Sequence, residues 1–137
     1  MVNVNNADIY THLYGLFNGT VSNQIYFGSI PTTLGTTDAS DFLVIKIGVP
    51  KDNSEFGGEY GYVRVYVETY FKSKDRGRMD LPKYRTLRTN INNVLVTECE
   101  NRNSTYPIRK NSILCDDDFL AANSYHYFTT SFRLLIK

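Results

Sequence analysis

The chain has 137 residues, of which 42% are hydrophobic and 21% are charged, and its net charge is +1. This composition excludes a disordered chain, and the length fits one globular domain with a sizeable core. No apolar run approaches the roughly 20 residues of a membrane span, and the opening stretch MVNVNNADIY lacks the basic and apolar regions of a signal peptide. We therefore expect no membrane partner. Eleven tyrosines and no tryptophan are typical of surfaces that are exposed to solvent in one state and buried in another, such as subunit interfaces.

The first expected element is a short amphipathic helix. Ile9, Leu13 and Phe17 recur at helical spacing, and Asn5 can cap the start. Gly19 is a plausible stop. The stretch QIYFGSIP then predicts a short extended segment, and a polar loop without periodicity follows it.

Two longer strands are expected next. Residues 41–50, DFLVIKIGVP, are apolar on both faces, which predicts a central strand. A glycine-bearing turn leads to GYVRVYVETYFK, whose valines alternate with tyrosines. The valine face belongs to the core, and the face that carries Tyr62, Tyr66 and Tyr70 is expected to be accessible. Two interpretations stay open: a solvated face with cross-strand pairs, or a subunit interface.

The second half of the chain predicts a long helix and a final strand. From Leu81, apolar residues recur at 3–4 spacing, with Asp80 as the cap, and Leu87, Ile91 and Val94 should pack on the valine face. Residues 101–118 read as irregular with one or two short extended pieces, and YHYFTTSFRLLIK alternates as a strand. The expected fold class is α+β: a single domain over residues 1–137, with a mostly antiparallel sheet of about four to five strands and two helices packed on one face.

Positive charge is concentrated between the two long elements. Seven basic and two acidic residues give residues 72–88 a net charge of +5, against +1 for the whole chain. The basic residues are Lys72, Lys74, Arg76, Arg78, Lys83, Arg85 and Arg88. Three interpretations remain: a solvated connection, a loop that docks on a partner or lines a pore, or a nucleic-acid site. No helix-turn-helix, zinc-finger or RNA-binding signature accompanies the segment.

The acidic counterpart is the run Asp116, Asp117 and Asp118. A turn or helix cap is one interpretation, and an acidic patch that meets the basic segment of a neighbouring subunit is another. A third is a metal-dependent nuclease site, in which the run would act with Glu98 or Glu100. No catalytic motif appears, so we expect no enzyme, no catalytic or metal residues and no cofactor.

The remaining reactive side chains give no pattern of their own. His12 lies on the first expected helix and His126 on the last strand, and the sequence does not establish the proximity that a nucleophile–base pair would need. Cys99 and Cys115 are expected to be reduced, with a bridge between them as the alternative.

The succession of elements resembles the tail terminator or tail completion proteins of long-tailed bacteriophages and their prophage relatives. Ile25, Tyr26 and Pro31 match an I-Y-x-x-x-x-P-like segment of that family, and Asp41–Pro50 matches the hydrophobic strand that follows its polar loop. A glycine-bearing turn, a long strand, a basic-to-helical segment and a terminal strand then follow in the same order. The resemblance covers nearly the whole chain.

The resemblance implies a structural virion protein of the tail or neck, assembled in the bacterial host cytoplasm. Such a subunit would form a homo-oligomeric ring, commonly a hexamer, that caps the head-proximal end of the tail tube and joins it to the neck. Its partners would be copies of itself, tube and neck proteins, and DNA passing through without sequence-specific contact. The alternatives are another neck or virion connector component without a tube-terminating role and, less favoured, a small metal-dependent nuclease.

Within such a ring, we expect three groups of residues to make contacts. The tyrosines Tyr62, Tyr66 and Tyr70 would pack against a neighbouring subunit. The basic residues Lys72, Lys74, Arg76, Arg78, Lys83 and Arg85 would face the lumen or an axial partner. Asp116, Asp117 and Asp118 would form the acidic counter-patch.

Overall fold

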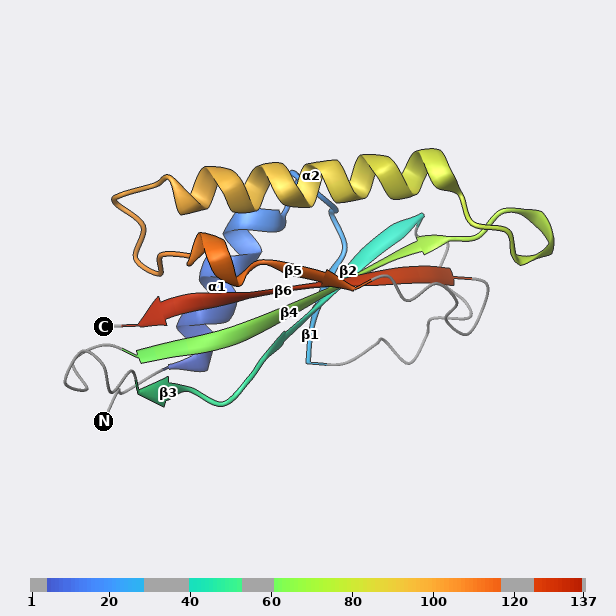
Figure 1. Cartoon of the computed structure of the whole chain (residues 1–137). Coiled ribbons are helices and arrows are strands. Elements are labelled where there is room, and N and C mark those ends of the chain that lie inside the picture. Colours follow the sequence, from blue (N-terminus) through green and yellow to red (C-terminus); the bar gives the residue numbers. More distant parts are fainter. Residues whose placement is uncertain (1–4, 29–39, 53–60, 117–124, 137) are drawn as a thin grey trace.

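One sheet and two helices make up the fold (Figure 1). The computed structural model describes residues 5–28, 40–52, 61–116 and 125–136. The strands are Ile25–Phe27 (β1), Asp41–Ile47 (β2), Lys51–Asp52 (β3), Gly61–Lys72 (β4), Leu114–Asp116 (β5) and Tyr125–Ile136 (β6). The helices are Asn6–Phe17 (α1) and Leu81–Cys99 (α2), with short 3-10 helices at Asp75–Gly77 (η3) and Lys110–Ser112 (η4). The expected α+β class is confirmed.

The sheet is built around the long antiparallel pair β4 and β6. Their register runs without interruption from the Gly61–Ile136 pair to the Lys72–Tyr125 pair. The strand order is β1-β2-β4-β6-β5; among the strand pairs of the described residues, β1–β2 is parallel and the others are antiparallel. The central position of β2, between β1 and β4, confirms the prediction from its two apolar faces. The short β3 pairs with the start of β4, where the sequence predicted only a turn.

The main core lies between the sheet and both helices. Val63, Val65 and Val67 of β4 are fully buried there. The helices contribute one apolar stripe each, formed by Ile9, Leu13 and Phe17 of α1 and by Leu87, Ile91 and Leu95 of α2. Burial of each such side chain contributes about 1.5–3 kcal/mol. Both helices therefore cover the same face of the sheet, as expected, although Val94 is only partly buried and Leu95 is the fully buried member.

Capping residues set the helix starts where the sequence placed them. The Asn5 side chain accepts a hydrogen bond from the Ala7 N–H, and the Asp80 side chain accepts one from the Lys83 N–H. After α1 the chain turns at Gly19, whose φ of +78° belongs to the left-handed region that glycine adopts without strain.

Several expected features fall outside the described residues. These are Pro31 with the polar loop at residues 32–39, the glycine turn at residues 57–58, and the pair Asp117 and Asp118. In the part of the chain that the structure describes, no helix has both the length and the apolar character to cross a membrane.

Candidate interaction surfaces

The face of the sheet opposite the helices, here called the outer face, carries the candidate surfaces. Because side chains alternate along a strand, β4 presents every second residue on it. The register sets them in cross-strand rows. Tyr70 lies between Phe42 and Tyr127, Glu68 between Val44 and Thr129, and Tyr66 between Lys46 and Ser131; Arg64 lies opposite Arg133, and Tyr62 opposite Leu135.

One end of the outer face is a closed aromatic cluster, here called the aromatic end. Its buried members are Phe42, Val44, Tyr70 and Tyr125, with Tyr26 and Tyr127 packed against them. The Phe42 and Tyr70 rings stack at 4.7 Å between centroids, and the Tyr70 and Tyr127 rings at 5.0 Å. Burial, together with the nearby Glu68 carboxylate, raises the pKa of Tyr70. Tyr70 is only 2% exposed, so the expectation that all three tyrosines line an accessible face is wrong for this residue.

The other end of the outer face, here called the open end, carries the rows of Tyr66, Arg64 and Tyr62. Tyr66 is 39% exposed. The Arg133 guanidinium lies 4.7 Å from the Tyr62 ring centroid, which is a cation–π geometry. Arg64 Nη1 donates a hydrogen bond to Ser131 Oγ at 3.1 Å. Tyrosine and arginine at an accessible position are the residue types that protein interfaces favour.

A small cavity lies at the open end beside the Arg64–Arg133 pair. It has a volume of about 220 Å³, and Arg109 also lines it. The sequence patterns do not single out these three arginines, because they come from separate strands and from an aperiodic segment. The signal that would have found them is the β4–β6 register, which places Arg64 directly opposite Arg133.

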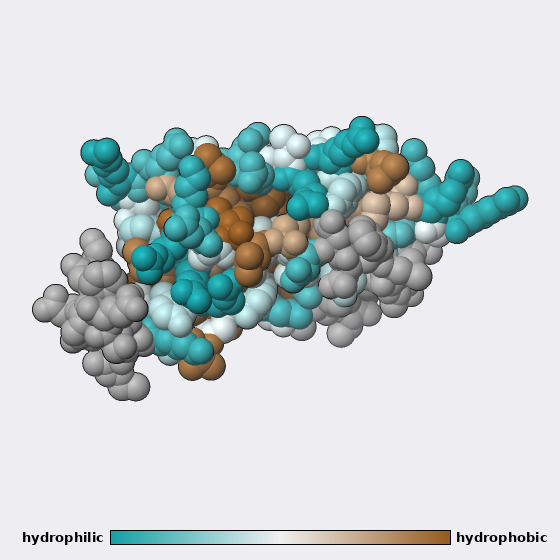
Figure 2. Space-filling model, viewed as in Figure 1, coloured by the Kyte–Doolittle hydropathy of each residue, from teal (hydrophilic) through white to brown (hydrophobic). Residues whose placement is uncertain are grey.

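The basic segment divides into a projecting tip and a helical part. Lys74 and Arg78 form an antiparallel bridge around η3, and Lys72, Lys74, Arg76 and Arg78 are all exposed. Figure 2 shows hydrophilic atoms projecting at the end of the molecule where Figure 1 places this connection between β4 and α2. Arg76 has a φ of +63°, an uncommon conformation for a residue other than glycine, and Gly77 follows at +73°. The tip is therefore a tight turn that holds its charges in water.

Two of the remaining basic residues have partners inside the subunit. Lys83 Nζ lies 2.6 Å from Asp41 Oδ2, and this contact ties the first turn of α2 to the start of β2. Burial would raise the pKa of Asp41, but hydrogen bonds from Lys83 and Ser22 and the charge of Lys83 outweigh it and lower that pKa. Arg88 donates to the Tyr84 hydroxyl and lies over its ring. Arg85, in contrast, is exposed.

The proposed acidic and nuclease residues lie on different sides of the sheet. Asp116 is exposed on β5 and pairs with Thr129, which places it on the outer face. Glu98 is buried in the helix layer, where it accepts a hydrogen bond from Ser104 and lies 3.7 Å from His12 Nε2. Among the residues that the structure describes, no three His, Cys, Asp or Glu side chains form a group that could hold a metal ion.

The two histidines have separate surroundings. His12 is next to Glu98 and to the edge of the Tyr106 ring, whereas the His126 Nδ1 atom is hydrogen-bonded to Ser73. Burial lowers the pKa of both, and for His12 the Glu98 charge opposes that effect. No disulfide joins Cys99 to Cys115.

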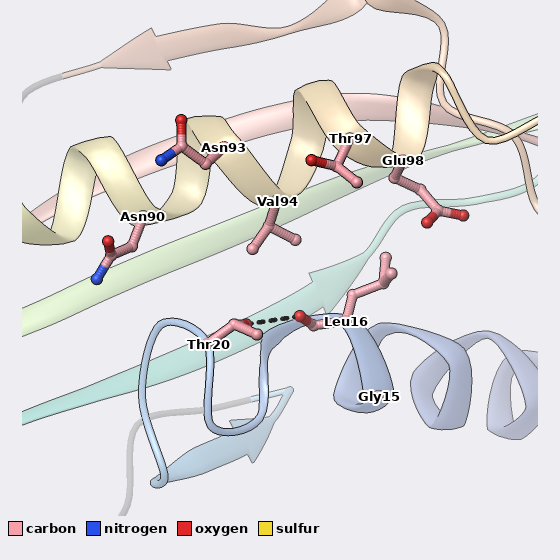
Figure 3. Close-up of a pocket in the computed structure, with 8 residues that line it drawn as sticks. All are labelled: Gly15, Leu16, Thr20, Asn90, Asn93, Val94, Thr97 and Glu98. Carbon is pink, nitrogen blue, oxygen red and sulfur yellow. Dashed lines mark hydrogen bonds between the residues drawn. The ribbon is translucent and has the colours of Figure 1, made fainter.

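A groove of about 470 Å³ between α1 and α2 is a further surface (Figure 3). Leu16 and Val94 provide its apolar part, and Asn90 and Asn93 add amide groups. Thr20 Oγ1 donates to the Leu16 carbonyl at 2.7 Å, which closes the end of α1. The groove offers hydrogen-bonding groups beside apolar side chains, on the side of the molecule opposite the outer face.

Comparison with known proteins finds a distant structural likeness. No protein family model matches the chain, and no curated protein matches it in sequence. Among solved structures, it is similar to the sheath/tube terminator of PVC, an extracellular contractile injection system, in the extended state. The TM-score is 0.45 at 8% identity, over 99% of this chain and 57% of that chain. This chain thus spans a little over half the length of that protein, and the likeness by itself assigns neither family nor function.

Proposed function

We propose that this protein is a structural subunit of a phage tail or tail-like assembly, a single domain over residues 1–137 without a catalytic role. In this proposal it forms a homo-oligomeric ring of about six copies. The ring caps the head-proximal end of the tail tube and joins it to the neck, after assembly in the host cytoplasm. The observation that carries the proposal is the open end of the outer face, where aromatic, apolar and arginine side chains remain accessible.

The composition of the open end supports an interface between protein subunits. Tyr66 is 39% exposed, and Leu114 of β5, which pairs with Ser131 in the same cross-strand row, is 56% exposed. Burial of apolar surface stabilises association by about 25 cal/mol per Å² before the costs of ordering. Tyr62 and Tyr66 keep their places in the interface hypothesis. Tyr70 supports them from within the subunit.

The basic tip supports a second, charged contact. Its four basic residues project into solvent, and Arg85 lies exposed in the second turn of α2. Such charges are better explained by an acidic partner than by the stability of the subunit. In a ring, the tip would face the lumen or an axial protein, and passing DNA is a further nonspecific contact.

The order of elements agrees with the resemblance to tail terminator proteins. Ile25 and Tyr26 lie in β1, and the hydrophobic β2, the long β4, the basic tip, α2 and β6 follow in the order on which the family resemblance rests. Another neck component with the same fold would share the surfaces but would not stop tube growth.

The oligomeric mass of the purified protein tests the ring. We expect a defined species of about six subunits by analytical ultracentrifugation, with ring-shaped particles in electron micrographs. A protein that stays monomeric at high concentration, both alone and with tube ends present, would contradict the proposal.

A second experiment separates a terminator from another connector. Tail tube protein from the same source is polymerised with and without this protein. We expect tubes of reduced length with density at one end. Rings that leave tube length unchanged and bind no tube end would favour the connector alternative.

A further inference from the structure

The cavity at the open end gathers three guanidinium groups from separate parts of the chain. It is lined by Arg64, Arg109, Asn111, Ser112, Leu114 and Arg133, and its volume is about 220 Å³. This size suits one small chemical group and not a large cofactor.

Backbone pairing fixes the three arginines in place. Arg64 and Arg133 are direct cross-strand partners in β4 and β6. The Arg109 N–H donates to the Arg133 carbonyl at 3.1 Å, and the Arg133 N–H donates to Ser112 Oγ at 2.9 Å. The segment that contains Arg109 runs along the edge of β6. The 3-10 helix η4 interrupts this pairing, and β5 resumes it at Leu114. The cluster is therefore set by the fold.

Within the described residues, the positive charges of this cluster have no carboxylate partner, although Arg133 lies over the Tyr62 ring and Arg64 donates to Ser131. Like charges directly opposite each other on neighbouring strands are unfavourable. Within residues 5–28, 40–52, 61–116 and 125–136, none of the three arginines forms a salt bridge. Arg133 Nε is buried and has no hydrogen-bond partner in that same part of the chain. A guanidinium has five N–H donors in a planar fork that matches a carboxylate or a phosphate.

The surroundings of the cavity distinguish between these two anions. Glu68 and Asp116 lie on the same outer face as the Arg64–Arg133 row, four strand positions away, at about 14 Å for an antiparallel strand. Lys46 Nζ lies 3.2 Å from Glu68 Oε1, so Asp116 is the member of this pair of carboxylates that forms no salt bridge within the described residues. A nucleic acid that followed the strands would bring phosphates toward Asp116, whereas a peptide can place an uncharged residue there. Leu114, at the rim and 56% exposed, suits an apolar side chain next to the anion.

We propose that the Arg64–Arg109–Arg133 cavity binds a carboxylate side chain from an acidic segment of a partner protein. The carboxylate accepts hydrogen bonds from the guanidinium groups, and its apolar neighbour packs on Leu114. The inference goes beyond the proposed ring, because the cavity would bind the same group in any assembly that uses the open end.

Nuclear magnetic resonance of the arginine Nε–Hε groups tests the site directly. The intact protein is titrated with a blocked peptide of alternating glutamate and leucine and, separately, with a single-stranded DNA oligonucleotide of equal charge, at one fixed ionic strength. We expect the Arg133 Nε–Hε signal to move in a saturable way with the peptide. Arg109→Gln should weaken that binding about tenfold, because one charge-assisted contact is lost.

Arg102→Gln is the matched control, since Arg102 is also exposed but does not line the cavity. It should change the affinity less than twofold, and the backbone spectra of both variants should match the parent. Arg133→Lys, which keeps the charge and loses the fork, should also weaken binding. Equal losses in the Arg109 and Arg102 variants, a stronger Arg133 response to DNA than to peptide, or no saturable response would each overturn the proposal.

Discussion

The two ends of the outer face belong to the same strands and obey the same alternation, yet one is closed and the other open. At the aromatic end, Tyr70 stacks between Phe42 and Tyr127 and is 2% exposed. At the open end, Tyr66 lies between Lys46 and Ser131 and is 39% exposed. The difference comes from the cross-strand neighbours, because aromatic neighbours bury a ring and polar neighbours leave it in water. Alternation along a strand determines which residues share a face, and their cross-strand neighbours determine which of them are buried and which stay accessible.

The largest expected effect is on the stability of the subunit, and it should differ between the two ends of the outer face. Tyr70→Ala removes a buried ring and its two stacked contacts, so it should lower the free energy of unfolding by about 3 to 5 kcal/mol. Tyr66→Ala, the matched change at the open end, should lower it by only about 0.5 kcal/mol. Urea denaturation of both variants gives the comparison. Similar losses would mean that the open end is part of the folded core as well.

The next effect concerns the contact that ties α2 to the sheet near the aromatic end. Asp41→Asn removes the charged partner of Lys83 and should cost about 2 kcal/mol at neutral pH. The folded-state pKa of Asp41 lies below its ordinary value, so its stabilisation is present above pH about 4 and is lost as the pH falls through the folded pKa.

The measurement for this variant is thermal unfolding as a function of pH. The difference between parent and Asp41→Asn should shrink in acid. Asp75→Asn, at an exposed acid in the tip, is the control and should show no such change. A constant difference at every pH would show that the carboxylate charge is not what stabilises this contact.

A change at the open end should affect association and spare folding. Tyr66→Ala should weaken subunit association by about 1 to 3 kcal/mol, with little dependence on salt, because the lost contact is mainly apolar. Sedimentation equilibrium of parent and variant measures it. Tyr14→Ala, at a tyrosine of similar exposure on α1, should associate like the parent. If only the Tyr14 variant were impaired, the interface would lie on the helix side.

The smallest effect on the subunit itself is expected at the basic tip. Reversal of charge at Arg76 and Arg78 should change the free energy of unfolding by no more than about 0.5 kcal/mol, because both side chains are exposed. Binding of the protein to its acidic partner should weaken, most strongly at low salt, where charge attraction is least screened. Pull-down of tail tubes at two salt concentrations measures it, with Arg102→Glu as the control. If the charge-reversed variant were pulled down with tail tubes as well as the parent, the tip would be only a solvated turn.

The sequence predicted most of the fold because long elements carry their own periodicity. The alternation in residues 61–72 and 125–136 and the 3–4 spacing after Leu81 need no tertiary information. The two residues of β3 carry no such pattern, and only their pairing with β4 makes them a strand.

The candidate surfaces were harder to predict because they depend on register. Sequence alternation placed Tyr62, Tyr66 and Tyr70 on one face, but the burial of Tyr70 depends on Phe42 and Tyr127, which come from other strands. The arginine cavity combines two strands with the aperiodic segment that contains Arg109, so no local pattern marks it. Among the basic residues, the sequence predicts a docking role for Lys83, although its contact with Asp41 appears only when α2 is placed on the sheet.

The pairing of β4 with β6 also decides when this protein can finish folding. Gly61 pairs with Ile136, so the most extensive strand pair joins segments that lie far apart along the chain. Until residues 125–136 have left the ribosome, β4 has only β2 and the short β3 as partners, and its other edge is unpaired. The chain loses the entropy of closing this long loop before the contacts between β4 and β6 can stabilise it. Folding should therefore be slow compared with that of a helical bundle of the same length. During that interval the exposed edge of β4 is open to pairing with another nascent chain.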